Sequence, residues 1–305
     1  MSSALEIKTV GVIGIGNMGA PMAANLVRAG FSVLLFDIDR ARAERVASDI
    51  GASAAANLDT LGRNADVIVT MLPTGHDVRR VLLEADEGAL TAALKPGSVV
   101  IDMSSSDPVG TRELGGLLAT RSLALIDAPV SGGVPRAKDG TLAIMIGGEA
   151  TVIARVKPVL AALGNRLFEV GSLGCGHAMK ALNNFLAATG FAAAAEAMMV
   201  GRRFGLDPAI MIDVVNVSTG RNFSTESTIK QQVLTGDFAS GFALGLLAKD
   251  VKIAADLADA IGMDAPLGRL VRDLWGEARD DIGGDRDHTR AAQAWEAKRM
   301  RRAAE

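Results

Sequence analysis

Short apolar runs alternate with amphipathic segments along the first half of the 305-residue chain. Five runs rich in β-branched residues, and two that follow them, are typical of strands: TVGVIGIG, SVLLFD, ADVIVTML, SVVIDMS and LALIDAPV, then TLAIMIGG and RLFEVG. The runs at 8–14 and 66–72 are apolar on both faces, which favours strands covered by helices on both sides. The alternation predicts a doubly wound, mostly parallel α/β sheet.

The pattern changes after Gly171, where long helical runs replace the strands. A first helix is expected over 176–203, with Gly205 suited to the position after its end and Asp207-Pro208 suited to start the next helix. Further helices are expected over 208–218, 224–234, 245–261, 266–280 and from 287 to the end. The sequence therefore predicts an α/β domain over 1–172 and an all-α domain over 173–305, which begins with a long interdomain helix.

Composition and charge make small molecules the expected partners. Hydrophobic residues make up 49% of the chain, enough for large buried cores. The formal net charge is −3, and no long run of lysine and arginine precedes the last few residues. We therefore expect neither nucleic acid nor an anionic membrane surface as a partner.

The longest apolar stretch, at 185–201, is mostly alanine, contains Glu196 and ends at Arg202 and Arg203. It is too weakly hydrophobic for a membrane span and favours a buried helix. A helix that is apolar on all sides needs cover on every side, so we expect a homodimer or homotetramer formed through the helical domain.

Several kinds of site are disfavoured by what the sequence lacks. Cys175 is the single cysteine, and the start of the chain, MSSALEIK, has no apolar leader, so a cytoplasmic location is expected. The chain has no tyrosine, which excludes the tyrosine proton donors of short-chain dehydrogenases and aldo-keto reductases. The spacing of His76, His177 and His288 matches no zinc motif, so no metal site is expected.

A glycine-rich motif, GIGNMG, follows the first predicted strand and opens a helix, as in Rossmann domains that bind dinucleotides. The first glycine allows a tight turn, the second lets the backbone approach a pyrophosphate, and the third lets helix and strand pack closely. Glycine-rich turns also end many strands that bind nothing. The expected cofactor contacts are Gly14, Ile15, Gly16, Asn17, Met18 and Gly19.

Asp37 ends the second predicted strand, where an acidic residue accepts hydrogen bonds from the adenosine ribose and repels a 2′-phosphate. NAD is therefore the expected cofactor. Arg40 and Arg42 lie nearby and could accommodate a phosphate, so NADP stays open as the alternative.

Later strands end at the same edge of the predicted sheet, where ligands of open α/β folds bind. Leu72, Pro73 and Asp77 follow the third strand, and serines 104–106 follow the fourth, so we expect cofactor contacts at both places. Ser106-Asp107-Pro108 is equally a plain helix start.

A candidate substrate site follows the fifth strand. Ser131, Gly132 and Gly133 offer a hydroxyl and unobstructed amides suited to a carboxylate, although a tight turn would look the same. Lys180 and Asn184 are four residues apart and share one helical face. A lysine beside a carbonyl can act as general acid and base, whereas most lysines at a helix start are merely exposed.

Four segments together resemble the β-hydroxyacid dehydrogenase family over essentially the whole length: GVIGIGNMGAPMAANLVRAG, DAPVSGGVPRAKDGTLAIMIGG, GHAMKALNN and LLAKDVKIA. The resemblance implies that Lys180 is the catalytic lysine and that Asn184 contacts the substrate. It implies that Ser131, Gly132 and Gly133 hold the substrate and that Lys249 and Ser105 contact the cofactor. Many relatives have threonine at position 105, which keeps the oxygen.

The resemblance also implies an activity, the NAD-dependent, reversible oxidation of a small β-hydroxy acid to its semialdehyde or ketone. The alternatives are an NADPH-preferring reductase of tartronate semialdehyde, succinic semialdehyde or sulfolactaldehyde, an imine reductase, and a cofactor-binding module without turnover. Imine-reducing relatives carry aspartate or tyrosine in place of the lysine, so Lys180 favours carbonyl chemistry. His177 as the acid would need an aspartate partner and a substrate arginine that the spacing does not supply. Candidate residues for substrate selectivity are Arg136, Lys138, Arg221, Asn222 and Ser224.

Overall fold

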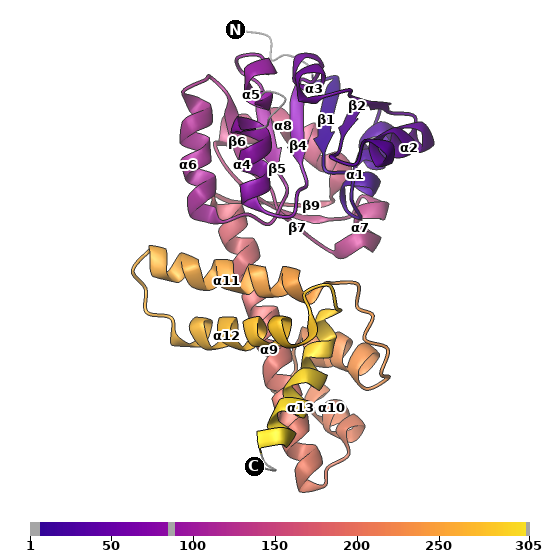
Figure 1. The fold of residues 1–305 in the computed structure, drawn as a ribbon, viewed down its shortest axis with the longest axis vertical. Coiled ribbons are helices and arrows are strands. Elements are labelled where there is room, and N and C mark those ends of the chain that lie inside the picture. The colour runs from indigo at the N-terminus through magenta and orange to yellow at the C-terminus, as the bar shows by residue number, and fades with distance from the viewer. Residues whose placement is uncertain (1–6, 85–88, 303–305) are drawn as a thin grey trace. The chain divides into compact units, whose positions relative to one another are not determined.

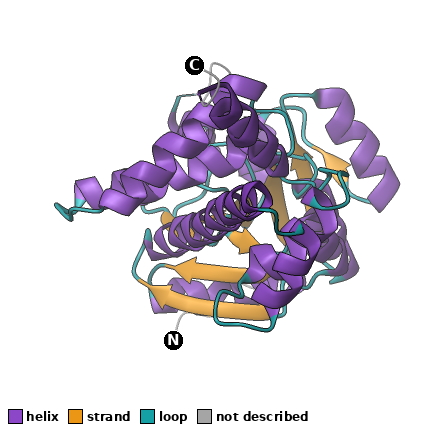
Figure 2. Ribbon diagram, turned by 90° about the horizontal axis from the view of Figure 1, so that it is seen from below, coloured by secondary structure: helices purple, strands orange, loops and turns teal. Residues whose placement is uncertain are grey.

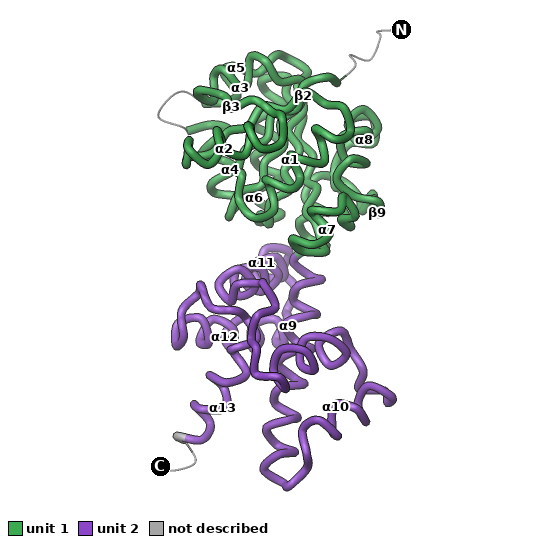
Figure 3. Tube along the Cα trace, turned by 90° about the vertical axis from the view of Figure 1, so that its right-hand side faces the viewer, with its two compact units in different colours: residues 1–180 green, residues 181–305 purple. Residues whose placement is uncertain are grey.

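The computed structural model describes residues 7–84 and 89–302, and its contacts divide the chain into two units, residues 1–180 and 181–305 (Figure 3). Helix α9 (Cys175–Phe204) begins in unit 1 and continues into unit 2. A domain boundary after residue 172 stays a prediction. The start of the chain, 1–6, and the end of the last predicted helix, 303–305, lie outside the described residues.

Unit 1 contains one sheet, in the order β3-β2-β1-β4-β5-β6-β8-β7, with β9 beside β8. Pairing is parallel from β3 to β6, whereas β8 runs antiparallel to β6 and β7 and parallel to β9. The strands are β1 (Thr9–Ile13), β2 (Ser32–Phe36), β3 (Ser53–Ala54), β4 (Val67–Thr70), β5 (Val99–Asp102), β6 (Ala124–Asp127), β7 (Val130–Ser131), β8 (Ala143–Gly147) and β9 (Arg166–Gly171). The predicted mostly parallel sheet is confirmed, and only the two-residue strands β3 and β7 were not predicted.

Helices cover both faces of this sheet (Figures 1 and 2), because alternate side chains of the central strands enter two separate cores. In β5, Val99 and Ile101 join one core and Val100 joins the other, and all three are fully buried. The helices of unit 1 before α9 are α1 (Gly19–Arg28), α2 (Arg40–Ile50), α3 (Leu58–Asn64), α4 (Gly75–Leu83), α5 (Leu90–Ala93), α6 (Pro108–Ala119), α7 (Gly133–Asp139) and α8 (Ala150–Leu163).

The remaining elements are helical, and no strand is assigned within 181–302. Gly205, with a φ of +104°, follows the end of α9, and Asp207 caps α10 by accepting from the amides of Ala209 and Ile210. Residues 224–233 were predicted as an ordinary helix, but their backbone has the wider turns of a π-helix. The elements after α9 are α10 (Pro208–Asn216), the π-helix η1 (Ser224–Val233), α11 (Leu244–Ala260), α12 (Pro266–Ile282), the 3₁₀ turn η2 (His288–Arg290) and α13 (Ala291–Arg302).

An aromatic cluster lies at the centre of the core of unit 2. Trp275 and Trp295 meet edge to face with 5.1 Å between ring centroids, and Phe191 lies 5.7 Å from Trp275. The indole N–H of Trp275 donates to the carbonyl oxygen of Ala188 at 3.3 Å, so its one polar group is paired although the side chain is fully buried. This cluster ties α12 and α13 to the middle of α9.

None of the helices in the described part of the chain has the length and hydrophobicity that crossing a bilayer requires. The same residues hold no cluster of three or more histidine, cysteine, aspartate or glutamate side chains that could bind a metal ion.

Candidate active site

The glycine turn links β1 to α1, and its three glycines occupy different surroundings. Gly14 has a φ of +94°, and a Cβ there would overlap the carbonyl oxygen of Met71. A Cβ on Gly19 would overlap the carbonyl oxygen of Gly14, so α1 could not start this close to the turn. At Gly16, in contrast, no described atom lies within 4 Å of such a Cβ. Gly16 therefore borders open space, which fits a site where a pyrophosphate meets the backbone.

The Asp37 carboxylate lies against this turn. Its Oδ2 atom accepts a hydrogen bond of 2.7 Å from the backbone N–H of Ile15, and only 7% of its side chain is exposed. A carboxylate oxygen can accept a second hydrogen bond, so ribose hydroxyls could still be bound. Arg42 lies 3.7 Å from the same oxygen, whereas Arg40 is paired with Glu44 at 2.8 Å. The position therefore carries a paired carboxylate, which fits an adenosine ribose better than a 2′-phosphate.

A buried aspartate organises the neighbouring strand ends. Asp102, 2% exposed, accepts from the Thr70 hydroxyl at 2.9 Å, from the Ser104 amide at 3.0 Å and from the Ser106 hydroxyl at 2.8 Å. The Ser104 hydroxyl in turn accepts from the amide of Leu72 at 2.9 Å. The loops after β4 and β5 are thus fixed to each other, and the hydroxyl of Ser106 donates its hydrogen to Asp102 rather than to a ligand.

The other predicted cofactor contacts at this edge differ in exposure. Pro73 is exposed and Ser105 is half-buried. Asp77 is engaged at the start of α4, where it accepts from the Thr74 hydroxyl at 2.7 Å and lies 3.4 Å from Arg80. The contacts of Asp77 are those of a helix-capping pair.

The predicted carboxylate loop begins at the end of β7. Ser131 and Gly132 are half-buried and Gly133 is exposed. Gly132 and Gly133 have φ values of +130° and +63°, which L side chains rarely adopt, so this backbone favours glycine at both positions. The side chain of Arg136 lies directly over Gly132.

Helix α9 brings Lys180 to the end of unit 1. Lys180 is half-buried, and His177, one turn earlier, is only 1% exposed. The amides of Gly174 and His177 both donate to the carboxylate of Asp127 at 2.7 Å. Burial raises the pKa of Asp127, although the nearby His177 and these backbone N–H donors act in the opposite direction. The His177 ring is sealed inside this cluster, which disfavours it as an acid for a substrate.

In unit 2, Asp250 holds two of the predicted site residues. Its Oδ2 atom accepts a hydrogen bond of 2.6 Å from the side-chain Nδ2 of Asn184, and its Oδ1 atom lies 3.3 Å from the Lys249 ammonium. The Asn184 oxygen accepts from Asn183 at 3.1 Å. Asp250 is 3% exposed, so the Lys249-Asp250 pair is not a solvated surface pair.

Asp250 could have been found from the sequence. It lies between Leu247 and Ala254, both buried, at spacings of three and four residues on the apolar face of α11. A carboxylate at such a position is costly unless it is paired, and therefore signals a buried partner.

The predicted site residues thus form two groups. Those in unit 1 lie at the carboxyl ends of β1, β2, β4, β5 and β7 and at the start of α9, whereas Asn184 and Lys249 are joined by Asp250 in unit 2.

Comparison with known proteins decides the family. The model described as the NAD binding domain of 6-phosphogluconate dehydrogenase matches residues 9–171, and the model described as NAD-binding of NADP-dependent 3-hydroxyisobutyrate dehydrogenase matches 174–295. The chain belongs to the β-hydroxyacid dehydrogenase family. As a member of this family it is an NAD-binding oxidoreductase that acts on hydroxyl groups, as its sequence predicted.

Similar β-hydroxyacid dehydrogenases cover nearly the whole chain. 2-(Hydroxymethyl)glutarate dehydrogenase of Eubacterium barkeri is 34% identical over 94% of this chain and 94% of its own. 3-Hydroxyisobutyrate dehydrogenase of Pseudomonas aeruginosa is 37% identical over 87% of this chain and 90% of its own. The solved structure of Mycobacterium tuberculosis 3-hydroxyisobutyrate dehydrogenase with L-serine has 33% identity and a TM-score of 0.86, covering 95% of this chain and 99% of that one.

Gly16→Ala should fold like the wild type but bind NAD⁺ at least about tenfold more weakly, or about 1.4 kcal/mol, because the methyl group would occupy the open space beside the turn. Isothermal titration calorimetry measures the dissociation constant. Gly116→Ala is the matched control, since Gly116 on α6 also borders open space but lies outside the turn. Equal NAD⁺ affinities of the two variants would contradict the assignment.

Asp250→Ala should lower kcat/KM for the hydroxy acid by about tenfold or more, because an unpaired buried polar group costs about 1–3 kcal/mol and the amide of Asn184 would lose its acceptor. Asp250→Asn, which can still accept from that amide, should lose less. Steady-state kinetics test whether kcat/KM decreases from wild type to Asp250→Asn to Asp250→Ala. Asp256→Ala removes a carboxylate from the same helix whose side chain is 43% exposed, and serves as the control.

Proposed function

We propose that this enzyme catalyses the NAD-dependent, reversible oxidation of a small β-hydroxy acid to its semialdehyde or ketone, with Lys180 as general acid and base. The observation that carries the proposal is the anchoring of the start of α9 at the carboxyl end of β6, through Asp127. Ser131 follows Asp127 by four residues, at the end of β7. The helix that carries Lys180 and the loop proposed to bind the carboxylate are therefore both attached close to the end of β6.

The chain's own residues divide the chemistry as follows. When bound, NAD⁺ supplies the acceptor for the hydride that leaves the carbinol carbon. The neutral amine of Lys180 accepts the hydroxyl proton as the carbonyl forms, and its ammonium returns the proton in the reverse direction. Ser131 and the amides of Gly132 and Gly133 hold the substrate carboxylate, while Asn184 orients the hydroxyl. The products are the carbonyl compound, NADH and one proton.

The contacts of Asp37 support NAD over NADP, because the carboxylate lies where a 2′-phosphate would be repelled and one nearby arginine, Arg40, is already paired. An NADPH-preferring reductase would depend on Arg42 instead. Lys180 supports carbonyl rather than imine reduction, and the presence of both the lysine and the glycine turn argues against a module without turnover.

The substrate class follows from the loop and from the relatives. The names of similar enzymes include a mono- and a dicarboxylic hydroxy acid, 3-hydroxyisobutyrate and 2-(hydroxymethyl)glutarate, and one similar structure contains L-serine. We propose a small hydroxycarboxylate for this chain as well. Arg136, which lies over Gly132, is the side chain best placed in unit 1 to select for a second anionic group.

We also propose a homodimer or homotetramer formed through the helical unit, in a cytoplasmic enzyme. The support for assembly is an exposed apolar stripe formed by Ile210 and Val214 on α10 and by Val217 at its C-cap. These residues recur at helical spacing and are 65%, 57% and 87% exposed. The nearby Phe204 is 87% exposed. The single cysteine suits a reducing compartment.

Lys180→Ala should reduce kcat by about 10²- to 10⁴-fold while the affinity for NAD⁺ stays unchanged, because only the proton transfer loses its catalyst. A panel of small hydroxy acids, followed by NADH absorbance with NAD⁺ or NADP⁺, identifies the substrate for this comparison. Lys252→Ala, an exposed lysine on α11, is the control. Turnover close to wild type in Lys180→Ala would contradict the role of the lysine.

Replacing Ile210 and Val214 by aspartate should convert the assembly to single chains, because charges on the stripe oppose its burial. Sedimentation velocity gives the mass. Ala209→Asp adds a charge to an exposed position of the same helix beside the stripe and should leave the mass unchanged. A wild-type mass equal to one chain would rule out the assembly.

A further inference from the structure

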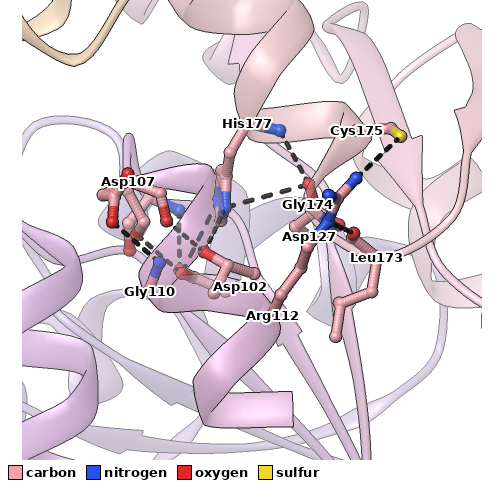
Figure 4. Close-up of polar contacts among 12 residues, drawn as sticks. Asp102, Asp107, Gly110, Arg112, Asp127, Leu173, Gly174, Cys175 and His177 are labelled. Atoms are coloured by element: carbon pink, nitrogen blue, oxygen red, sulfur yellow. Dashed lines mark hydrogen bonds and ion pairs between the residues drawn. The ribbon is translucent and has the colours of Figure 1, made fainter. Parts of the chain in front are cut away.

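The N-terminus of α9 is capped by a side chain from a distant strand. Asp127, at the end of β6 and fully buried, accepts from the Gly174 amide through Oδ1 and from the His177 amide through Oδ2, each at 2.7 Å (Figure 4). Gly174 directly precedes α9 and His177 lies in its first turn, so both donors belong to the start of a helix 30 residues long, whose positive end favours a carboxylate. Hydrogen bonds of this kind to an ionised group are about twice as strong as neutral ones.

Two glycines let the helix approach this carboxylate. A Cβ on Gly147, at the end of β8, would lie 2.8 Å from the amide nitrogen of Gly176, and a Cβ on Gly176 would lie 2.8 Å from Oδ2 of Asp127. Neither position accepts a larger side chain unless the helix start moves. The first turn of α9 is therefore seated on the strand ends by contact as well as by hydrogen bonds.

The His177 ring makes a second attachment, to α6 and β5. The Thr111 hydroxyl donates its single hydrogen to the carbonyl oxygen of Asp107 at 2.8 Å, so the 2.9 Å contact with His177 is donated by the Nδ1–H of the ring. The Nε2 atom faces Oδ2 of Asp102 at 3.7 Å, and the Nδ1 atom lies 3.8 Å from Oδ2 of Asp127. The whole side chain is buried, so these contacts are shielded from water.

Through Asp102, the cluster reaches the loops predicted to contact the cofactor. Asp102 binds Thr70 at the end of β4 and the amide of Ser104, whose hydroxyl accepts from Leu72. Hydrogen bonds within unit 1 therefore join the loops after β4 and β5 to Asp102. The Nε2 atom of His177, which has no hydrogen-bond partner among the described residues, lies 3.7 Å from that carboxylate. Lys180 follows His177 by one helical turn.

We propose that Asp127 and His177 are positioning residues, which fix the first turn of α9 so that Lys180 is held at the reacting hydroxyl. The proposal rests on the proposed function for the role of Lys180 but adds residues that touch neither substrate nor cofactor. A displacement of about 1 Å in a catalytic group can cost about 10²-fold in rate, so loss of this anchor acts on kcat.

The test uses variants of the full-length enzyme. In Asp127→Asn the amide nitrogen replaces one acceptor and faces a backbone N–H, so one of the two capping hydrogen bonds is lost. We expect kcat to fall about 10- to 100-fold, with NAD⁺ affinity and substrate KM within about twofold of wild type. The limb of the kcat–pH profile that reports Lys180 should also shift.

The control is Asp207→Asn, because Asp207 caps α10, a helix without a predicted site residue, by accepting from two amides through Oδ1 alone. This change removes a carboxylate charge while the remaining oxygen can still accept from both amides. It should leave kcat and the pH profile unchanged. His177→Asn keeps a donor near the position of Nδ1 and should retain more activity than His177→Phe, which keeps only the ring shape. If Asp127→Asn does not fold, the comparison of His177→Asn with His177→Phe tests the positioning role.

A second readout does not depend on turnover. The pH midpoint for acetylation of Lys180, followed by mass spectrometry with the exposed Lys252 as internal reference, should shift in Asp127→Asn and in His177→Phe but not in Asp207→Asn. If no hydroxy acid is oxidised by the wild type, the proposed function fails and the acetylation result still decides the positioning role. Folded Asp127→Asn and His177→Phe variants with wild-type kcat and wild-type acetylation midpoints would overturn the inference.

Discussion

Parallel pairing from β3 to β6 places the carboxyl ends of six strands at one edge of the sheet, and most of the site depends on this constraint. At such an edge the strand ladder stops, while the next helices begin with unpaired N–H groups. In this chain, buried carboxylates accept hydrogen bonds from several of these N–H groups. Asp37 accepts from the glycine turn, Asp102 from the end of β4 and the loop after β5, and Asp127 from the start of α9. Each acidic residue ends the strand before it or follows directly.

These carboxylates make the edge rigid before any ligand is bound. A carboxylate inside a protein is stable only when hydrogen bonds replace its lost water, and here most of the donors are backbone amides or hydroxyls of neighbouring loops. Moving one loop would leave a buried charge without its donors. The hydrogen bonds that stabilise these buried carboxylates therefore also fix the positions of the glycine turn, the loop after β5 and the start of α9 within unit 1.

Much of the fold was predictable because its signals are local. β4 and β5 are apolar on both faces, and α10 carries Asp207 and Pro208 at its start, so short stretches of sequence determine them. The two-residue strands β3 and β7 are too short to show a period, and η1 has a helical composition that does not distinguish a π-helix from an α-helix.

The candidate site divides in the same way. The glycine turn and the Lys180 segment are recognisable as motifs, whereas the partners that hold them come from far along the chain. Asp127 meets His177 across 50 residues, and Asn184 meets Asp250 across 66. His177 attracted attention as a possible acid, but its burial and its contact with Thr111 give it a structural environment instead. No sequence spacing indicates such pairs, because only the folded chain brings them together.

The hydrogen bond from Ile15 to Asp37 has a consequence for altering this enzyme. The residue expected to discriminate between the two nicotinamide cofactors is also the acceptor that fastens the glycine turn to β2. Exchanging Asp37 for a small neutral side chain, to admit a 2′-phosphate, also removes the hydrogen-bond acceptor that holds the glycine turn. Cofactor selectivity and the geometry of the glycine turn therefore depend on the same side chain. A change of cofactor requires a second substitution that gives the amide of Ile15 a new acceptor.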